Sequence, residues 1–276
     1  MNIGILHPGS MGVSVAASAV SGGHRVMWAS AGRSAASVAR AKEHGLVDGG
    51  TLAEVAASSE VIISVCPPAA AIDVADSVAA AGFTGTYVDC NAISPMRMNR
   101  IAERLQQGGA RVVDAGIIGN PAWVANKTFL YLSGDGAEEV AALFDKGLLV
   151  TKVMAGRKVG DASAMKMCYA AYTKGTTAIV CAILAAADEL GVRDEINAHW
   201  NMDQAGRAAE RERSVSLVTQ KAWRWVDEMH EIAATFASVG QPDGFHEAAA
   251  QLYTRLDGLK DGPHPTPVET VLAALK

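Results

Sequence analysis

Short apolar runs alternate with helical stretches through the first part of the chain, and this alternation constrains the fold more than any other feature. The runs typical of strands are Asn2–Leu6, Arg25–Trp28, Val61–Val65, Tyr87–Asp89, Arg111–Asp114 and Phe129–Leu132. Helical patterning fills the intervals, for example over Met11–Val20 and Ser34–His44. Strands separated by helices of this length predict right-handed crossovers and a doubly wound, mostly parallel sheet.

The second part of the chain changes character near Val159, after which no further strand pattern occurs. The stretch Ala162–Leu190 is typical of one long helix, and Gly191 is a suitable residue to end it. Further helices fit the stretches Asp194–Asn201, Ala205–Val239 with breaks, Phe245–Gly258 and Pro267–Leu275. The sequence therefore predicts an α/β domain over residues 1–158 and an all-α domain over residues 159–276.

Charge and cysteine content narrow the classes of partner. A net charge of −5 leaves no overall positive surface for nucleic acid, so we expect no nucleic-acid partner. Neither the four cysteines nor the histidines have the spacing of a metal site, and we expect none. A strand pattern that starts at Met1, with no signal peptide, predicts reduced thiols in the cytoplasm. The longest apolar run, Thr176–Ala187, is too short to span a bilayer, so we expect no membrane partner.

A glycine-containing turn follows the first strand. A dinucleotide-binding (Rossmann) turn uses three glycines, and here Gly9 and Gly12 occupy the second and third places while His7 occupies the first. The helix that follows would offer free N–H groups to a pyrophosphate. An ordinary glycine-rich turn is the alternative. On the cofactor interpretation, the residues in contact with the dinucleotide are His7, Pro8, Gly9, Ser10, Met11 and Gly12.

The end of the second strand indicates which dinucleotide is bound. An NAD site usually has an acidic residue there for the ribose hydroxyls. The residues after Trp28 include no carboxylate, whereas Ser30, Arg33 and Ser34 can donate hydrogen bonds to a 2′-phosphate. A solvated arginine on a loop is the alternative. We expect the cofactor to be NADP.

Two later strand ends complete the predicted cofactor site. Cys66, Pro67 and Pro68 follow a central strand at the point where a nicotinamide would lie, although the prolines could also serve only to end that strand. Asn91 follows the next strand along the chain. We assign these four residues to the cofactor side of the site.

Four segments together resemble a known family. They are the turn Gly4–Gly12, the loop Asp89–Pro95 that ends in Ser-Pro, the segment Asp114–Asn120, and the segment Gly160–Lys166 at the start of the long helix. They resemble the β-hydroxyacid dehydrogenase superfamily, which includes 6-phosphogluconate dehydrogenase and 3-hydroxyisobutyrate dehydrogenase. The resemblance covers essentially the whole chain, and it looks closest to bacterial 6-phosphogluconate-dehydrogenase-like proteins that begin with Leu-His-Pro-Gly. It implies a Rossmann domain followed by a helical domain for substrate binding and dimerisation.

The resemblance also implies roles for single residues. Lys166 falls on the catalytic acid/base lysine of the family, but the asparagine that usually follows one turn later is absent. Ile118 and Asn120 replace a serine and a glycine that grip the substrate carboxylate in the family. Asp227 stands where the family has a lysine. The expected substrate-binding residues are Ser94, Ile118, Gly119, Asn120 and Asp227.

The position of Lys166 near the start of a long helix agrees with acid–base chemistry. Burial and the positive end of the helix would both lower the pKa of its ammonium group toward neutral pH. A lysine whose head reaches solvent from an apolar helix is the alternative. Tyr169 lies three residues on and shares the same helix face, so it is either a second catalytic proton donor or a packing residue.

Three expectations concern other charged side chains of the helical domain. Lys174 fits a solvated lysine better than an anion-binding one. Asp227 shares a helix face with Trp223, which favours an acidic and aromatic wall for the substrate. Arg224 and Glu228 have the spacing of an ion pair within one helix.

These observations favour an NADP-dependent oxidoreductase that transfers a hydride between nicotinamide and a small carbonyl or hydroxy compound. An imine reductase on the same fold and a non-catalytic NADPH-binding sensor are the alternatives. The apolar, alanine-rich helical domain would expose more hydrophobic surface than a monomer usually does, so we expect a homodimer.

Overall fold

A computed structural model describes all residues from 1 to 276. The chain divides into two compact units, Met1–Met167 and Cys168–Lys276, which we call the sheet unit and the helical unit. The domain boundary predicted between residues 158 and 159 remains a prediction.

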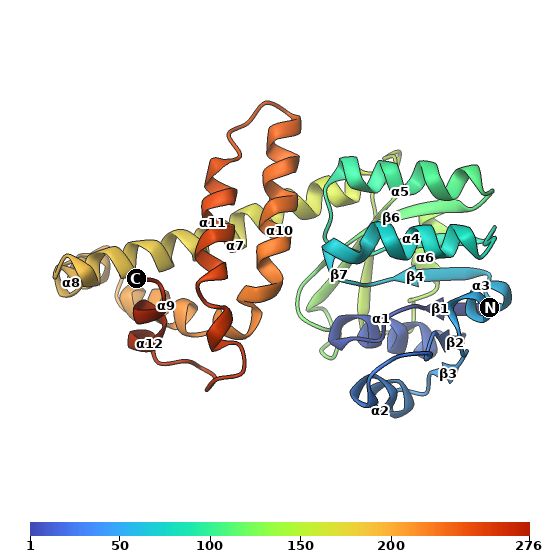
Figure 1. Cartoon of the computed structure of the whole chain (residues 1–276), viewed down its shortest axis with the longest axis horizontal. Helices are drawn as coiled ribbons and strands as arrows, with labels where there is room; N and C mark the ends of the chain where they lie inside the picture. Colours follow the sequence, from blue (N-terminus) through green and yellow to red (C-terminus); the bar gives the residue numbers. More distant parts are fainter. The chain divides into compact units, whose positions relative to one another are not determined.

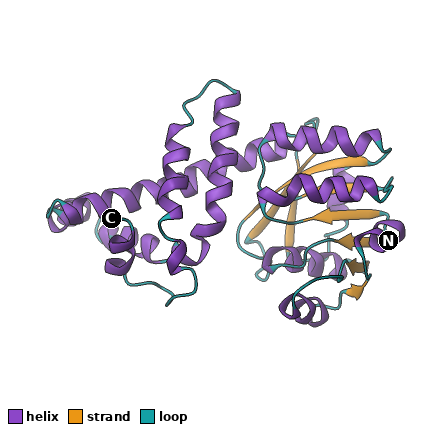
Figure 2. Ribbon diagram, viewed as in Figure 1, coloured by secondary structure: helices purple, strands orange, loops and turns teal.

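The sheet unit is built on one eight-stranded sheet in the order β3-β2-β1-β4-β5-β6-β7-β8 (Figure 2). All neighbouring strands pair in parallel except β6 and β7, which are antiparallel. The strands are β1 (Asn2–Ile5), β2 (Arg25–Trp28), β3 (Val47–Asp48), β4 (Val61–Ser64), β5 (Thr86–Asp89), β6 (Arg111–Ile118), β7 (Thr128–Ser133) and β8 (Leu149–Val153). This arrangement confirms the predicted doubly wound, mostly parallel sheet.

Helices cover both faces of this sheet (Figure 1). They are α1 (Ser10–Ser21), α2 (Ala35–Glu43), α3 (Leu52–Ser58), α4 (Ala71–Ala80), α5 (Pro95–Gln107) and α6 (Ala137–Ala142), with a 3₁₀ turn η1 (Pro68–Ala70). Helices α1, α2 and α6 contribute to one buried apolar cluster, and α3, α4 and α5 contribute to another. Neighbouring residues of β4, β5 and β6 supply opposite clusters, as strands buried on both faces require.

Two strands and one strand end differ from the sequence expectations. The two-residue strand β3 is too short to give a pattern, and β8 contains the polar residues Thr151 and Lys152, so neither was predicted. Strand β6 continues to Ile118, four residues beyond its predicted end at Asp114. This extension brings Gly116 and Ile117 into the sheet.

Helix α7 (Asp161–Glu189) begins in the sheet unit and continues into the helical unit. The rest of the helical unit contains no strand, as predicted. Its helices are α8 (Arg193–Asp203), α9 (Arg207–Ser216), α10 (Thr219–Ser238), α11 (Gly244–Thr254) and α12 (Val268–Ala274), with a 3₁₀ turn η2 (Asp257–Leu259). Helices α10 and α11 pack side by side (Figure 1).

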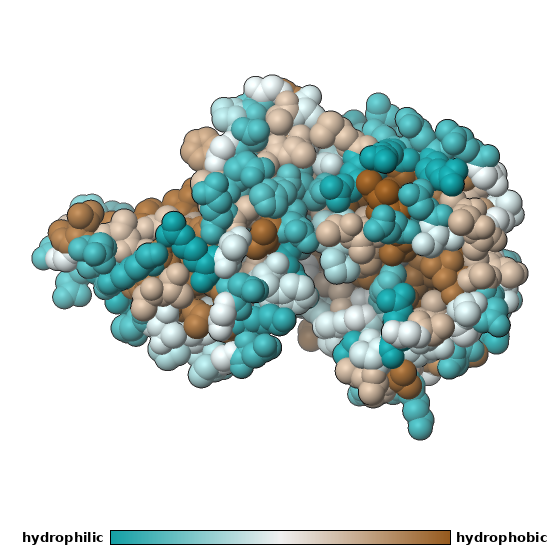
Figure 3. Space-filling model, viewed as in Figure 1, coloured by the Kyte–Doolittle hydropathy of each residue, from teal (hydrophilic) through white to brown (hydrophobic).

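Helix α7 is the one helix long and apolar enough to cross a membrane by length and composition alone. A core helix of a soluble protein passes the same test, so this property is weak evidence for a span. Hydrophobic residues are also exposed between α7 and α8 and near the end of α8, namely Leu190, Val192 and Met202. In Figure 3, that end of the helical unit shows brown residues among teal ones.

Candidate active site

The glycine turn between β1 and α1 has the geometry of a phosphate cradle. A Cβ atom on Gly12 would collide with the backbone oxygen of His7, so the turn can close only with glycine there. A Cβ atom on Gly9 would meet nothing within 4 Å, so the backbone faces open space at that point. Gly9 is the N-cap of α1 and no side chain caps the helix, which leaves its first N–H groups available to an anion. These features fit a pyrophosphate group.

His7 lies inside this turn and is uncharged near neutral pH. Burial, and secondarily the positive charge of Arg33, lowers the pKa of the His7 imidazole to about 4. The Nη2 atom of Arg33 is 2.9 Å from His7 Nε2, while His7 Nδ1 is buried without a hydrogen-bond partner. A neutral ring that accepts from Arg33 leaves the positive charge of the guanidinium uncompensated.

A second arginine, Arg40 on α2, also reaches the turn. Its Nε atom donates to the Pro8 carbonyl oxygen at 3.2 Å, and its Nη2 atom donates to Ser37 Oγ at 3.2 Å. Sequence analysis missed Arg40, although it lies only seven residues after Arg33. Ser34 is the N-cap of α2 and its Oγ accepts the Ser37 N–H, which is a structural role; its role toward a 2′-phosphate remains a prediction.

The end of β2 has a carboxylate beside it, which the local sequence did not show. Strand β3 pairs with β2 so that Asp48 lies opposite Trp28. The Asp48 carboxylate accepts hydrogen bonds from Ser30 Oγ and from Gly50 N, and these bonds lower its pKa. The loop after β2 itself contains no acidic residue. The fold brings one to the end of β2 from the neighbouring strand β3.

The predicted residues after β4 and β5 lie together. The Cys66 N–H donates to Asn91 Oδ1 at 2.6 Å, so the two strand ends are joined. Pro68 begins η1, and its carbonyl oxygen accepts from Arg97 Nη1 at 3.0 Å. Ser94 is the N-cap of α5, where its Oγ accepts the Arg97 N–H.

Lys166 is held against β6 through three residues of that strand. Its Nζ donates to the Ile117 carbonyl oxygen at 2.6 Å. A Cβ atom on Gly116 would lie 2.9 Å from Ala162 O and 3.1 Å from Lys166 Cβ, so glycine is needed for α7 to approach the strand this closely. The buried carboxylate of Asp114 accepts hydrogen bonds from Gly160 N, Ser163 N and Ser163 Oγ at 2.7–2.9 Å. Asp114 thereby caps the first turn of α7, where its negative charge is favourable.

Burial lowers the pKa of Lys166 to about 8. The cause is desolvation, because an ammonium group out of water loses hydration that one carbonyl oxygen does not replace. Lys166 was expected to have a lowered pKa, and the direction agrees. A group with this pKa exchanges its proton near neutral pH.

The predicted substrate residues of β6 and its loop lie just beyond this lysine in the sheet. Ile118 is the last residue of β6 and is buried. Gly119 has φ of 123°, and a Cβ there would lie 2.5 Å from Lys127 O, so only glycine suits the position. The Asn120 carbonyl oxygen accepts from Thr128 Oγ1 at 2.6 Å. The roles of these residues toward a substrate remain predictions.

Two predicted residues, Tyr169 and Asp227, belong to the helical unit. Tyr169 on α7 is 45% exposed, which fits both a proton donor and a half-buried packing residue. Asp227 is half-buried on α10. Their roles in a site with Lys166 remain predictions.

The expected charge pairing in the helical unit was wrong. Lys174 forms an ion pair with Glu228, and both side chains are largely buried. Lys174 is therefore not a solvated lysine, and Glu228 is paired across to α7 rather than with Arg224 of its own helix. The Tyr253 hydroxyl donates to the Lys174 carbonyl oxygen at 2.6 Å, and Trp225 stacks edge-on against the Tyr253 ring. This cluster ties α7 to α10 and α11.

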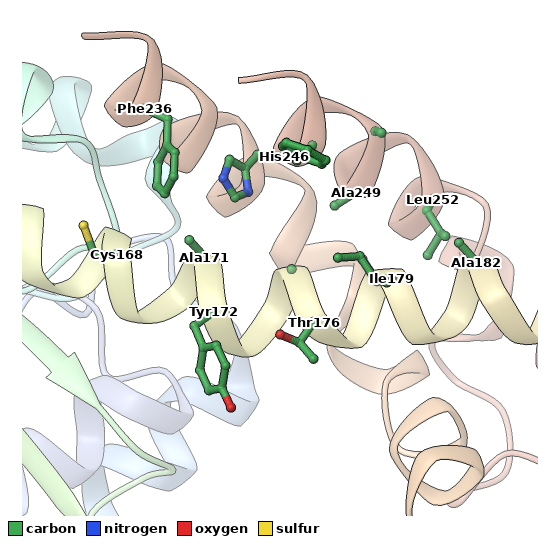
Figure 4. A pocket seen from close by; sticks show the side chains of 14 residues that line it. Cys168, Ala171, Tyr172, Thr176, Ile179, Ala182, Phe236, His246, Ala249 and Leu252 are labelled. Carbon is green, nitrogen blue, oxygen red and sulfur yellow. The ribbon is translucent and has the colours of Figure 1, made fainter. Parts of the chain in front are cut away.

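A largely apolar groove of about 520 Å³ lies in the helical unit between α7 and α11 (Figure 4). The side chains of Ala171 and Ile179 face it from α7, and Ala249 and Leu252 face it from α11 (Figure 4). Sequence analysis did not identify this groove, because its residues come from segments about 70 positions apart. The spacing of small residues along α7 is the one signal that could have indicated it.

Two parts of the chain match known protein families. Residues 2–148 match the family described as the NAD binding domain of 6-phosphogluconate dehydrogenase. Residues 187–256 match a domain of unknown function. An uncharacterized 28.5 kDa protein of Methanothermus fervidus is 32% identical over 139 residues, which cover 50% of this chain and 52% of that protein. The match thus spans about half the length of this curated relative.

Solved structures share the fold over nearly the whole chain. A conserved protein of unknown function, described as structurally similar to 3-hydroxyacid dehydrogenases, is 26% identical with a TM-score of 0.69, covering 94% of this chain and 97% of its own. The 3-hydroxyisobutyrate dehydrogenase of Mycobacterium tuberculosis is 16% identical with a TM-score of 0.71 and covers 100% and 99%. An imine reductase of Streptomyces aurantiacus is 15% identical with a TM-score of 0.55 and covers 100% of both. The last two show likeness of fold alone.

Proposed function

Because this chain belongs to the family of the NAD binding domain of 6-phosphogluconate dehydrogenase, we propose that it is an NADP-dependent oxidoreductase acting on a small carbonyl or hydroxy compound. Lys166 is the proton donor in reduction and the acceptor in oxidation. The protein works in the cytoplasm.

The turn between β1 and α1 holds the pyrophosphate of the cofactor. Gly9 leaves space above the backbone, and the uncapped start of α1 donates N–H groups to the phosphates. Arg33 and Arg40 supply positive charge to a 2′-phosphate, which a bidentate guanidinium suits. When bound, NADPH supplies the hydride.

Lys166 carries the acid–base role. All residues of the proposed cofactor site follow the carboxyl ends of β1, β2, β4 and β5, and Ile117 lies at the carboxyl end of the adjacent parallel strand β6. Ligands of doubly wound folds bind at this edge. The ammonium of Lys166, hydrogen-bonded to Ile117 O, donates a proton to the oxygen of the reduced carbonyl and is left as a neutral amine. It then takes a proton from solvent.

The observation that carries the proposal is this location of Lys166, an ammonium with a pKa of about 8 at the cofactor edge of the sheet. It is tested by steady-state turnover with NADPH or NADH on aldehydes, 2- and 3-oxoacids with their hydroxyacids, and cyclic imines. We expect turnover of carbonyl or hydroxy compounds that is lost in Lys166→Ala. Turnover of imines alone would make the chain an imine reductase. Tight NADPH binding without turnover of any compound would favour a sensor.

The helical unit supports a homodimer. Tyr172 and Phe245, at the groove between α7 and α11, are each 73% exposed, and Ile179 is 54% exposed. A surface of this kind is unusual on a monomer. A second copy of the chain covers it in our proposal.

A further inference from the structure

A buried carboxylate that the proposed mechanism does not use lies beneath the cofactor edge of the sheet. Asp89 is the last residue of β5 and is 1% exposed. Its Oδ1 accepts the Asn91 backbone N–H at 2.9 Å, and its Oδ2 accepts from Asn91 Nδ2 at 3.0 Å. Both carboxylate oxygens of Asp89 thus accept hydrogen bonds from the same residue, Asn91.

Asn91 uses its whole side-chain amide in this network. The amide nitrogen donates to Asp89 Oδ2 and to Ser64 Oγ, the latter at 3.2 Å. The amide oxygen accepts the Cys66 N–H at 2.6 Å. If the amide turned over, its oxygen would face the carboxylate and its NH₂ would face another N–H group. The Asp89 carboxylate therefore fixes which way the Asn91 amide points.

The orientation of this amide determines where the chain runs after β4. The Cys66 N–H is bonded to Asn91, and the next residues, Pro67 and Pro68, have no N–H groups of their own. Asn91 therefore provides the one side-chain hydrogen bond to backbone nitrogen in the Cys66–Pro68 turn. This turn lies at the carboxyl end of β4, beside β1, where the strand order of the sheet reverses. Dinucleotides bind at that point in doubly wound sheets.

We propose that Asp89 is a positioning residue of the cofactor site, which orients the Asn91 amide and thereby fixes the Cys66–Pro68 turn against the nicotinamide half of the cofactor. The inference rests on the proposed function for the identity of the cofactor. It adds a residue that contacts no cofactor atom and acts only through Asn91.

The ionisation state of Asp89 affects how firmly it orients the Asn91 amide. Burial raises its pKa to about 7, the Asn91 hydrogen bonds oppose that rise, and Asp114 on β6 adds to it. The other titratable groups close to Asp89 are Tyr87, Cys66 and Cys90, all of which stay protonated near pH 7 because their pKa values are raised. Protonation of Asp89 removes one acceptor from Asn91, so the turn loosens as pH falls below 7.

The test measures NADPH affinity directly, by quenching of protein fluorescence, and needs no substrate. In Asp89→Asn the new amide can offer its NH₂ group to Asn91 where a carboxylate oxygen stood, so the Asn91 amide loses its fixed direction. We expect the dissociation constant for NADPH to rise about tenfold or more, the usual effect of losing a hydrogen bond to a charged group. Asp73→Asn, an exposed aspartate on α4, is the matched control and should bind as the wild type does.

Two further measurements separate positioning from a general structural role. Asn91→Ala should weaken binding to a similar degree, and the double variant should be no weaker than Asn91→Ala alone, because Asp89 acts through Asn91. Additive losses would overturn the proposal. In the wild type, the amide resonance of Cys66 should shift with a midpoint near pH 7. A Cys66 resonance that shows no titration anywhere between pH 4 and 9 would overturn it even if Asp89→Asn does not fold.

NADPH binding by the wild type and by Asp89→Asn distinguishes a wrong cofactor assignment from a wrong role for Asp89. If the wild type binds neither NADPH nor NADH, the proposed function is wrong and the inference falls with it. If the wild type binds NADPH and Asp89→Asn binds it equally well, the proposed function stands and the inference alone is wrong.

Discussion

The ammonium nitrogen of Lys166 lies 2.6 Å from the carbonyl oxygen of Ile117, and this bond joins the first turns of α7 to the end of β6. The partner is a backbone dipole and not a carboxylate, so the charge of the lysine is oriented without being neutralised. A carboxylate partner would have raised the pKa of the ammonium, whereas burial lowers it here to about 8. The arrangement suits a group that must give up its proton.

Replacement of Lys166 should affect turnover far more than cofactor binding. We expect Lys166→Ala to lower kcat by about 10²–10⁴-fold, the usual contribution of general acid–base catalysis. Lys166→Arg should not restore activity, because a guanidinium does not release its proton near neutral pH. Steady-state kinetics together with NADPH titration would measure both effects. Near-normal kcat in the alanine variant would make the lysine structural, and the acid would then be sought at Tyr169.

The rate of carbonyl reduction should fall as pH rises. Reduction needs the protonated ammonium, which is the major form below its pKa of about 8, so kcat should decline through that pH. Oxidation of the hydroxy compound needs the neutral amine and should show the opposite slope over the same range. Profiles in the two directions with the same substrate pair provide the check. Parallel slopes in both directions would contradict the role of Lys166.

Gly116→Ala should separate α7 from β6. The added methyl group would lie 2.9 Å from a backbone oxygen of α7, so the helix must shift, at a cost of about 1–3 kcal/mol in stability. A shift of the helix also displaces Lys166, and kcat should fall while the affinity for NADPH holds. Gly175→Ala is the control in the same helix, since a Cβ there meets nothing within 4 Å. Thermal unfolding and kinetics of the two variants, measured side by side, would show whether only the first is impaired.

Arg33→Ala should change the choice of cofactor. The guanidinium at the cofactor turn is paired only with the neutral ring of His7, which leaves its charge for a 2′-phosphate. We expect weaker binding of NADPH and nearly unchanged binding of NADH. Arg40→Ala should act in the same direction. Isothermal titration would measure the affinity of each variant for NADPH and for NADH. An equal loss of affinity for both cofactors would show that Arg33 does not contact the 2′-phosphate.

A homodimer should form in dilute solution. Light scattering should give about twice the chain mass of 28.7 kDa. Tyr172→Glu should shift the population toward the monomer, because it introduces a charge at the edge of an apolar groove. Val38→Glu, at an exposed apolar residue of α2 in the sheet unit, is the matched control. A monomeric wild type would contradict the proposal outright.

The fold was predictable because its signals are local. The alternation of strand and helix patterns and the turn around Gly9 and Gly12 depend on neighbours within a few residues, and the structure has the sheet and the turn they predict. The partners of charged groups are not local. Asp48 reaches the end of β2 through a two-residue strand, and Lys174 finds Glu228 more than 50 positions away. No spacing rule in a single sequence indicates such pairs.

The role of Asp114 shows the same limit within a recognised motif. Its place in the segment Asp114–Asn120 was visible in the sequence, but its hydrogen bonds to Gly160 and Ser163 appear only when β6 and α7 meet. A buried acid in an apolar strand is a signal that some partner exists. It does not say which residue that partner is.

Asp48 has a consequence for how this protein could change its cofactor over evolutionary time. The carboxylate that an NAD-specific relative would need for the ribose hydroxyls already stands next to Ser30, held there by β3. The arginines at the turn would then be what disfavours that alternative. A lineage could therefore move from one cofactor toward the other by losing a cation, without first acquiring an acid.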